Sequence, residues 1–253
     1  MTNHKPEVKE LMKMTDKQLK IGRVSQSGAF ACYIAVFLFD YTCEAAKPWA
    51  DAGYLCYCVD CQHEPGESRK GNIIKVGADI TNWMPPNGNI VFVGAFPPCT
   101  DVAVSGAAHF KKKGLTAVIG ALQLFEAAVR IAEWANAPYF LENPVSTVSS
   151  YWRKPDHIFN PYEFGAYLPE DDVNPVSDLI PARDAYPKKT CLWTGNGFVM
   201  PEKKPVDCPA GYSPMHKKLG GKSIKTKNIR SATPRGFAKA VFEANNMASA
   251  KAI

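Results

Sequence analysis

Phe92–Thr100, with the sequence FVGAFPPCT, is the stretch that decides the fold. It continues an apolar run, Ile90–Val93, which predicts a buried strand. Gly94 ends that strand, and the two prolines that follow fix the backbone directly ahead of Cys99. In open α/β sheets, ligands and reactive groups collect at the carboxyl ends of the strands. Cys99 is therefore a candidate reactive thiol, and packing as an ordinary buried cysteine is the alternative.

A second predicted strand, Pro138–Glu142, ends in the sequence LENP. One thiol, Cys99, and one carboxylate, Glu142, thus follow two strands that are separated by one predicted helix. A thiolate adds to C6 of a pyrimidine ring when a carboxylic acid protonates N3 at the same time. That addition makes C5 nucleophilic toward an electrophilic methyl group. The pair therefore predicts covalent catalysis on a pyrimidine.

Apolar runs alternate with helical periodicity along most of the chain, which predicts an α/β fold with a doubly wound, mostly parallel sheet. The predicted strands are Cys32–Phe39, Tyr54–Val59, Ile73–Val76, Ile90–Val93, Tyr139–Leu141 and Lys188–Thr194, and the helices are Ala45–Ala52, Leu115–Asn136 and Ala232–Asn245. In the long helix we expect one apolar face to pack on the core. Its members are Leu115, Val118, Ile119, Leu122, Phe125, Val129 and Ala132.

The chain divides into four parts by composition. Residues 1–30 form an N-terminal extension with a weak amphipathic pattern, and residues 31–194 form the core. Residues 195–230 are rich in Gly, Pro and Lys, with few residues able to build a core, so we expect loops supported by the main domain. Residues 231–253 are expected to form a helix that returns to the core.

Positive charge is concentrated at the end of the chain. From Pro201 onward there are 11 Lys and Arg against 3 Asp and Glu, whereas the preceding 200 residues carry 19 against 21. A basic end on a neutral body favours a polyanionic partner, and a solvated tail is the alternative. Lysines contact phosphates, which carry no sequence information, so the recognised nucleic-acid site is expected to be short.

The eight cysteines are predicted to be free thiols in a reducing cytoplasm, because no signal peptide is recognisable. The longest apolar run, Phe30–Phe39, is far shorter than the roughly 20 residues that span a bilayer. Strand alternation places Cys56 and Cys58 on one face and Cys61 on the other. With no second paired cluster to complete a ligand set, we expect no metal site.

The motifs, taken in order, resemble those of the cytosine-5 DNA methyltransferase family, in the compact form often encoded by bacteriophages. Residues 97–103, PPCTDVA, match the nucleophile motif, and residues 141–144, LENP, match the Glu-Asn motif. Residues 37–54 resemble the cofactor loop, and residues 231–238, SATPRGFA, resemble the closing motif. Residues 164–165 and 186–190 match the basic motif loosely. The resemblance covers residues 36–245 and implies a Rossmann-like fold that binds S-adenosylmethionine.

By this resemblance, a monomer transfers a methyl group from S-adenosylmethionine to C5 of a cytosine flipped out of DNA. Cys99 attacks C6, Glu142 protonates N3, Asn143 orders the loop, and Lys189 replaces the usual arginine near the base. The expected cofactor-binding residues are Phe39, Asp40, Thr42, Asp60, Asp79, Ile80, Pro97, Ser231 and Thr233. The expected DNA contacts are Lys217, Lys218, Lys222, Lys225 and Arg230.

The sequence departs from the family pattern in the cofactor loop. That loop is Phe-x-Gly-x-Gly in the family, and Tyr41 and Cys43 hold the two glycine positions here. Glycine allows the backbone to approach the methionine part of the cofactor. Tyr41 and Cys43 therefore permit an alternative, a DNA-binding or decoy protein without methyl transfer. Two further alternatives stay open, namely modification of pyrimidine C5 in RNA or a free nucleotide, and transfer of a group other than methyl. The alternative to cofactor binding by Asp79 is an Asx turn. For Asp60 the alternative is a solvated carboxylate at the end of a strand.

Overall fold

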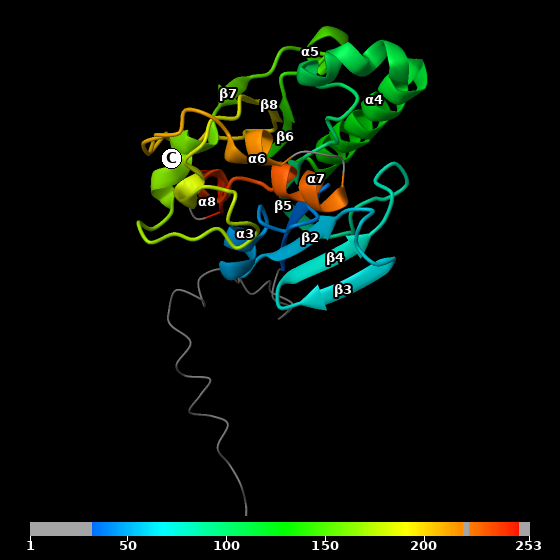
Figure 1. Ribbon diagram of the computed structural model, residues 1–253. Helices are drawn as coiled ribbons and strands as arrows, with labels where there is room; N and C mark the ends of the chain where they lie inside the picture. Colours follow the sequence, from blue (N-terminus) through cyan, green and yellow to red (C-terminus); the bar gives the residue numbers. More distant parts are fainter. Residues whose placement is uncertain (1–31, 220–222, 248–253) are drawn as a thin grey trace, which may run out of the picture.

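The computed structural model describes residues 32–219 and 223–247, and it is built on an eight-stranded sheet with the order β3-β4-β2-β1-β5-β6-β8-β7 (Figure 1). Strands β4, β2, β1, β5 and β6 are parallel, β3 is antiparallel to β4, and β8 is antiparallel to both β6 and β7. The strands are β1 (Tyr33–Leu38), β2 (Leu55–Val59), β3 (Gly66–Lys70), β4 (Ile73–Gly77), β5 (Asn89–Ala95), β6 (Tyr139–Pro144), β7 (His157–Phe159) and β8 (Thr190–Gly195). This mixed, mostly parallel sheet confirms the predicted α/β class.

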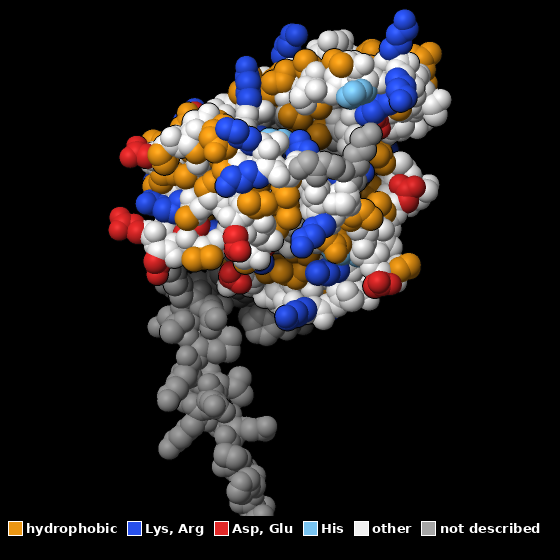
Figure 2. Space-filling view, viewed as in Figure 1, with side chains coloured by type: hydrophobic (Ala, Val, Ile, Leu, Met, Phe, Trp, Pro, Cys, Tyr) orange, Lys and Arg blue, Asp and Glu red, His pale blue; other side chains and the backbone are white. Residues whose placement is uncertain are grey.

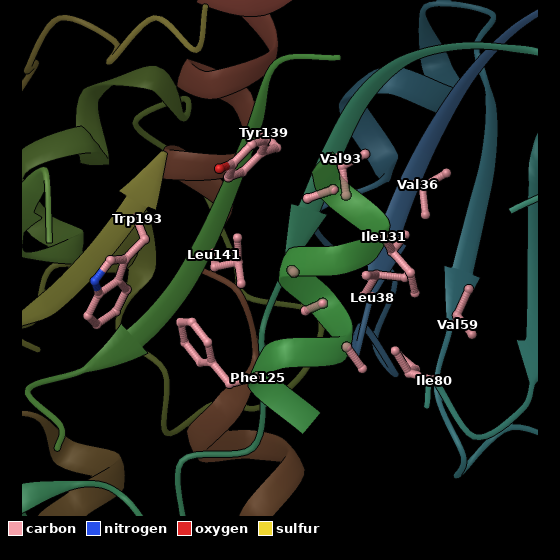
Figure 3. Close-up of a cluster of buried hydrophobic side chains, with 14 of the residues drawn as sticks. Val36, Leu38, Val59, Ile80, Val93, Phe125, Ile131, Tyr139, Leu141 and Trp193 are labelled. Carbon is pink, nitrogen blue, oxygen red and sulfur yellow. The ribbon is translucent and has the colours of Figure 1, made fainter. Parts of the chain in front are cut away.

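Helices cover both faces of the sheet, and the two sides of β1 contribute to different hydrophobic clusters. Leu38 packs with Ile131 of α4 on one face (Figure 3), whereas Phe37 belongs to the cluster of Trp49 in α3 and Phe237 in α8. The α-helices are α3 (Lys47–Asp51), α4 (Phe110–Ala135), α5 (Val148–Tyr151), α6 (Pro214–Lys218), α7 (Ile224–Ser231) and α8 (Arg235–Asn245). Short 3₁₀ helices are η1 (Val104–His109), η2 (Pro161–Tyr167) and η3 (Ala182–Asp184). Burial on both faces explains why the central strands are continuous apolar runs.

The helix α4 differs from its prediction in its length and in its apolar face. It begins at Phe110, before the predicted start, and Gly114 at φ 73° makes a kink inside it. Phe125 and Ala132 are buried as expected, but Leu115 is 80% exposed and Ile119 is 53% exposed. The expectation that the whole stripe packs on the core was therefore wrong for the first half of the helix.

The stretch Val104–Ala135, which comprises η1 and α4, is long and apolar enough to cross a membrane by length and composition alone. Its second half, however, contributes Phe125, Ala128 and Ile131 to the cluster of buried residues under the sheet. That placement is the one expected for the core helix of a globular domain.

The segment 195–230 contains two short helices, α6 and α7, where we expected only loops. Met215 of α6 and Ile229 of α7 form a small buried cluster with Ile180 and Tyr186. This cluster attaches the basic segment to the loops that precede β8. The predicted N-terminal extension, residues 1–30, lies outside the described residues.

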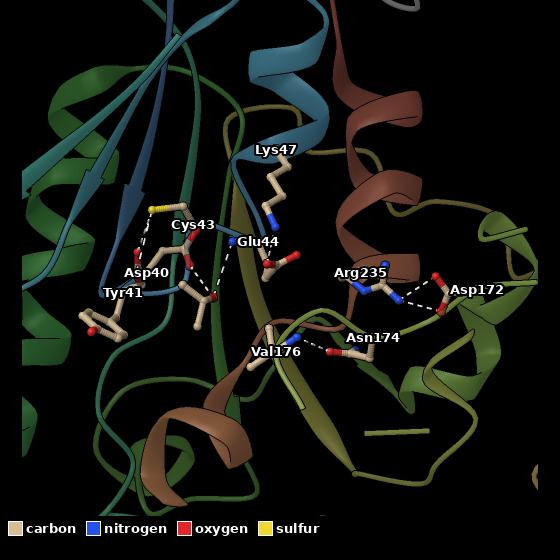
Figure 4. Close-up of polar contacts among 10 residues, drawn as sticks. Asp40, Tyr41, Cys43, Glu44, Lys47, Asp172, Asn174, Val176 and Arg235 are labelled. Atoms are coloured by element: carbon tan, nitrogen blue, oxygen red, sulfur yellow. Dashed lines mark hydrogen bonds and ion pairs between the residues drawn. The ribbon is translucent and has the colours of Figure 1, made fainter. Parts of the chain in front are cut away.

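Two buried acids hold the start of α8. Arg235 Nη2 contacts both carboxylate oxygens of Asp172, at 2.7 and 2.5 Å (Figure 4). The backbone N–H of Gly236 donates to Asp184 Oδ2 at 2.8 Å, and burial raises the pKa of Asp184 to about 6. These contacts fix residues 231–234, which immediately precede the helix.

Candidate active site

The carboxyl ends of β1 and β5 lie side by side at the point where the strand order reverses. Strands β2 and β4 follow β1 on one side, and β5 and β6 follow on the other. Ligand crevices of open α/β sheets form at such a switch point. The loop after β1 begins at Phe39, and the loop after β5 contains Cys99. The backbone N–H of Phe96 donates to the Leu38 carbonyl at 3.0 Å, which joins the two loops at their origin.

Asn143 ties the Cys99 loop to the neighbouring strand β6. Its side chain is fully buried, and Nδ2 donates to the Pro97 carbonyl at 2.8 Å. The two residues are far apart in the sequence, so this hydrogen bond sets the position of the loop relative to β6. Cys99 itself is partly exposed, as a thiol that meets a substrate must be.

Glu142 and Lys188 lie beside the thiol. Lys188 Nζ is 3.6 Å from Glu142 Oε1, and both side chains are largely buried. Burial and then the negative charge of Glu142 raise the pKa of Cys99, whereas the positive charges of Lys188 and Arg230 lower it. The structure therefore places Cys99 within the electrostatic influence of Glu142, Lys188 and Arg230, while Asn143 ties the Cys99 loop to β6.

The lysine in this cluster is Lys188, whereas we expected Lys189. Lys188 and Thr190 both line a small cavity with Glu142, and Lys189 is exposed. Lys188 and Thr190 thus face the cavity directly ahead of β8, and the intervening Lys189 faces solvent.

The segment before α8 completes this cavity. Ser231 and Thr233, which we expected at the cofactor, line the cavity together with Glu142 and Lys188. The remaining lining residues are Phe96, Phe159, Thr190, Pro234 and Phe237. The structure thus places the closing segment next to the carboxylate.

The loop after β1 contains two buried carboxylates. Asp40 is 3% exposed, and its Oδ1 accepts a hydrogen bond from Thr42 Oγ1 at 3.2 Å. Glu44 is also buried and pairs with Lys47 (Figure 4). Asp40 Oδ2 and Glu44 Oε2 have no hydrogen-bond partner among the described residues. Burial raises the pKa of Asp40 to about 7. A cation that approaches their unpartnered oxygens, such as the ammonium or sulfonium group of S-adenosylmethionine, favours the ionised form of Asp40, so the loop fits this cofactor.

The two residues in the glycine positions behave differently. Cys43 has φ 59°, which is the left-handed conformation that glycine favours, at a steric cost of about 1 to 2 kcal/mol for another residue. Tyr41 is not left-handed, and its ring stacks on His63 with 5.3 Å between the centroids. Phe39 is also left-handed, at φ 60°. The loop therefore keeps one glycine-like turn and gains an aromatic pair that sequence reasoning missed.

The expected adenine and ribose residues are partly committed to local hydrogen bonds. Asp79 Oδ1 accepts from the N–H of Thr81 at 2.9 Å and from its Oγ1 at 2.8 Å, which also lowers the pKa of Asp79. This is the Asx turn that was the alternative for Asp79. Ile80 is buried in the core, and Asp60 accepts from the N–H of Gln62 at 2.8 Å.

An open cleft lies between the Cys99 loop and the first half of α4. Its lining residues are Thr81, Pro98, Thr100, Asp101, Thr116, Ala117, Gly120, Ala121, Gln123 and Leu124. None of the residues predicted to bind the cofactor lines this cleft, although Thr81 follows Asp79 and Ile80 directly.

The predicted DNA contacts are on α6 and α7, on the face where lysine and arginine side chains are conspicuous in Figure 2. Lys217, Lys218 and Lys225 are exposed, and Lys217 Nζ lies 4.2 Å from the ring centroid of Tyr212. Arg230 is only partly exposed and contacts His216. Lys222 lies outside the described residues.

Cys56 and Cys58 share one face of β2 as predicted, whereas Cys61, expected on the opposite face of the strand, lies in the turn beyond it. Cys56 and Cys58 are fully buried in the same hydrophobic cluster, and Cys61 is exposed beyond the strand. Within residues 32–219 and 223–247, no group of three or more His, Cys, Asp or Glu side chains could hold a metal ion.

Comparison with protein-family models finds no match for this chain, and comparison with curated proteins finds none either. The functional interpretation therefore depends on the motifs and on the geometry described above.

Proposed function

We propose that this protein transfers a methyl group from S-adenosylmethionine to C5 of cytosine in DNA, with a Rossmann-like methyltransferase fold. The observation that carries the proposal is the meeting of Cys99, Glu142 and Lys188 at the adjacent ends of β5 and β6. Asn143, which holds the Cys99 loop against β6, supports the same reaction. The free thiols and the basic segment fit a cytoplasmic enzyme whose partner is DNA.

Each residue of the cluster has a role in the covalent step. The Cys99 thiol loses its proton and adds to C6 of the cytosine, and Lys188 and Arg230 stabilise the thiolate that attacks. Glu142 donates a proton to N3, so that the negative charge does not build up on the ring. Once C5 has formed its bond to the methyl group, loss of the C5 proton to water breaks the bond between C6 and the Cys99 sulfur, and N3 returns its proton to Glu142. Bound S-adenosylmethionine would supply the electrophilic methyl group, held by Asp40 and Glu44 through its positive charge.

The test is methyl transfer followed by capture of the covalent step. Incubation with labelled S-adenosylmethionine and DNA, followed by nucleoside mass spectrometry, is expected to give 5-methylcytosine. DNA with 5-fluorocytosine should form a stable adduct at Cys99, because fluorine cannot leave C5 as a proton does. Cys99→Ser should abolish the adduct and keep the fold. An adduct at another cysteine, or label in RNA or a free nucleotide but not in DNA, would contradict the proposal.

A second candidate is a DNA-binding protein of this fold that lacks methyl transfer. The observation that favours it is Tyr41, which puts an aromatic side chain where the family has glycine and stacks it on His63. Calorimetric titration with S-adenosylmethionine separates the two candidates. Binding with a measurable heat supports the enzyme, whereas DNA binding without any affinity for the cofactor supports the second candidate.

A further inference from the structure

Arg230 lies next to the candidate active site, although it belongs to the basic segment. It is in the last turn of α7, and the next residue, Ser231, lines the cavity that contains Glu142 and Lys188. Its charge also influences the Cys99 thiol. This position separates Arg230 from Lys217, Lys218 and Lys225, which are exposed on the outer surfaces of α6 and α7.

The guanidinium of Arg230 is oriented by a neighbouring helix. Its Nη2 lies 2.7 Å from His216 Nδ1 of α6. Burial and the positive charges of Arg230 and Lys188 lower the pKa of His216, so the ring is neutral and Nδ1 accepts the hydrogen bond. This hydrogen bond uses one of the five N–H donors of the Arg230 guanidinium. Because the guanidinium is planar, the same contact also sets the direction of the other four donors.

Arg230 has no carboxylate partner within the described part of the chain, in contrast to Arg153 and Arg235. Arg153 pairs with Asp156 and Arg235 pairs with Asp172, each through two short contacts. Glu142, the acid of the candidate site, is paired with Lys188. An oriented guanidinium without a counter-charge, one residue from the lining of the cavity that contains Glu142, is suited to an anion that arrives with the substrate.

We propose that Arg230, oriented by His216, binds the phosphate group of the target nucleotide itself. The inference rests on the proposed function, because it takes a cytosine nucleotide as the substrate. A planar guanidinium matches two phosphate oxygens, and a base held at Cys99 carries its own phosphate within the reach of one nucleotide. The exposed lysines are left to contact the flanking phosphates. Arg230 thus fixes the DNA backbone at the target nucleotide relative to the flipped base.

The test compares ligands with and without the phosphate. Deoxycytidine and its 5′-monophosphate are titrated into wild-type protein, Arg230→Ala and Lys225→Ala, the last being a matched loss of one charge from the same helix. Binding is measured by calorimetry and by protection of Cys99 from iodoacetamide. In the wild type we expect the monophosphate to bind about 10- to 100-fold more tightly than the nucleoside, as for hydrogen bonds to charged groups. The ratio of the two dissociation constants, nucleoside to monophosphate, should fall close to one in Arg230→Ala and stay unchanged in Lys225→Ala.

A second arm distinguishes a DNA phosphodiester from a free phosphate. Cytosine-containing oligonucleotides carry one neutral methylphosphonate, either at the target cytidine or several nucleotides away. Wild-type protein should lose affinity mainly from the first replacement, and Arg230→Ala should lose the same small amount from both. His216→Ala should reduce the monophosphate preference in part, because the guanidinium remains but its orientation is lost.

The outcomes separate the two proposals. If the protein methylates DNA but binds charged and neutral ligands equally in both arms, the role of Arg230 is wrong and the enzyme proposal stands. If Lys225→Ala reduces the preference as much as Arg230→Ala, the effect is general charge and the inference fails. If the protein binds no cytosine ligand and modifies no DNA, both proposals are wrong.

Discussion

Replacement of Asn143 by alanine should loosen the loop that carries Cys99. The change removes the Nδ2 donor from the Pro97 carbonyl, and both residues are buried. A buried carbonyl left without a donor costs about 1 to 3 kcal/mol, and the truncated side chain adds a small cavity. We therefore expect Asn143→Ala to lower the free energy of unfolding by about 2 to 4 kcal/mol, measured by denaturant titration. Alkylation of Cys99 by iodoacetamide should become faster in the folded protein, because the loop is less restrained.

Asn245→Ala is the matched control. Its side chain accepts from the N–H of Val199 and donates to the Val199 carbonyl, each at 2.8 Å, and also donates to the Val241 carbonyl within α8 at 3.0 Å. Both contacts with Val199 are exposed, so water can replace them. We expect a loss below about 1 kcal/mol and no change in Cys99 alkylation. Equal losses for Asn143→Ala and Asn245→Ala would refute the argument that burial of the hydrogen bond matters. An unchanged alkylation rate in Asn143→Ala would refute the claim that Asn143 positions the thiol.

The other predictions concern charge and close packing. Glu142→Gln should speed alkylation of Cys99 at neutral pH, because the negative charge of Glu142 raises the pKa of the thiol. Lys188→Met should slow alkylation, because the positive charge of Lys188 lowers that pKa. If both variants changed the rate in the same direction, the electrostatic influence of these two residues on Cys99 would be contradicted. The pKa of Asp40 is raised to about 7, so the folded protein keeps a proton on Asp40 that the unfolded chain releases near pH 4. The free energy of unfolding should therefore fall as the pH rises from about 4 to about 7. Asp40→Asn should flatten that part of the stability profile, and an unchanged profile would show that Asp40 titrates normally. Gly236→Ala should destabilise the fold by about 1 to 3 kcal/mol in thermal unfolding, although alanine favours helices, because the added Cβ would lie 2.4 Å from a backbone oxygen.

Most of the sheet could be predicted because its strands are buried on both faces. The runs at Tyr33–Leu38 and Asn89–Ala95 are apolar over several consecutive residues, and a parallel strand under two helical layers has that pattern. Strand β3 was missed because its sequence, GESRK, is exposed throughout and its only partner is β4. Backbone pairing holds it in place, and backbone pairing leaves no trace in side-chain polarity.

The apolar face of α4 was mispredicted because helical spacing does not show where a helix leaves the sheet. With 26 residues, α4 is about 39 Å long, whereas the seven residues of β5 extend about 23 Å. The first half of the helix therefore projects past the end of the sheet, and Leu115 and Ile119 stay exposed there among the described residues. Periodicity alone gives both halves the same pattern.

At the candidate site, the motifs predicted which strand ends meet but not every side chain that joins them. Cys99, Glu142 and Asn143 were found from local sequence, because each directly follows or ends a recognisable strand. The contact between Arg230 and His216 depends on the packing of α6 against α7 through Met215 and Ile229. That packing comes from a segment whose composition resembles a loop, so no pattern pointed to it.

The position of α8 has a consequence for synthesis on the ribosome. Phe242 packs on Trp49 of α3 at 5.2 Å between ring centroids, and Phe237 stacks on Phe159 of β7 at 4.2 Å, so α8 covers an aromatic cluster that includes Phe37 of β1. A nascent chain emerges at about 5 to 20 residues per second, and its sheet keeps that aromatic surface exposed until α8 leaves the exit tunnel. A chaperone that shields aromatic surface is expected to hold the chain until then, and a stalled chain that lacks α8 is expected to aggregate.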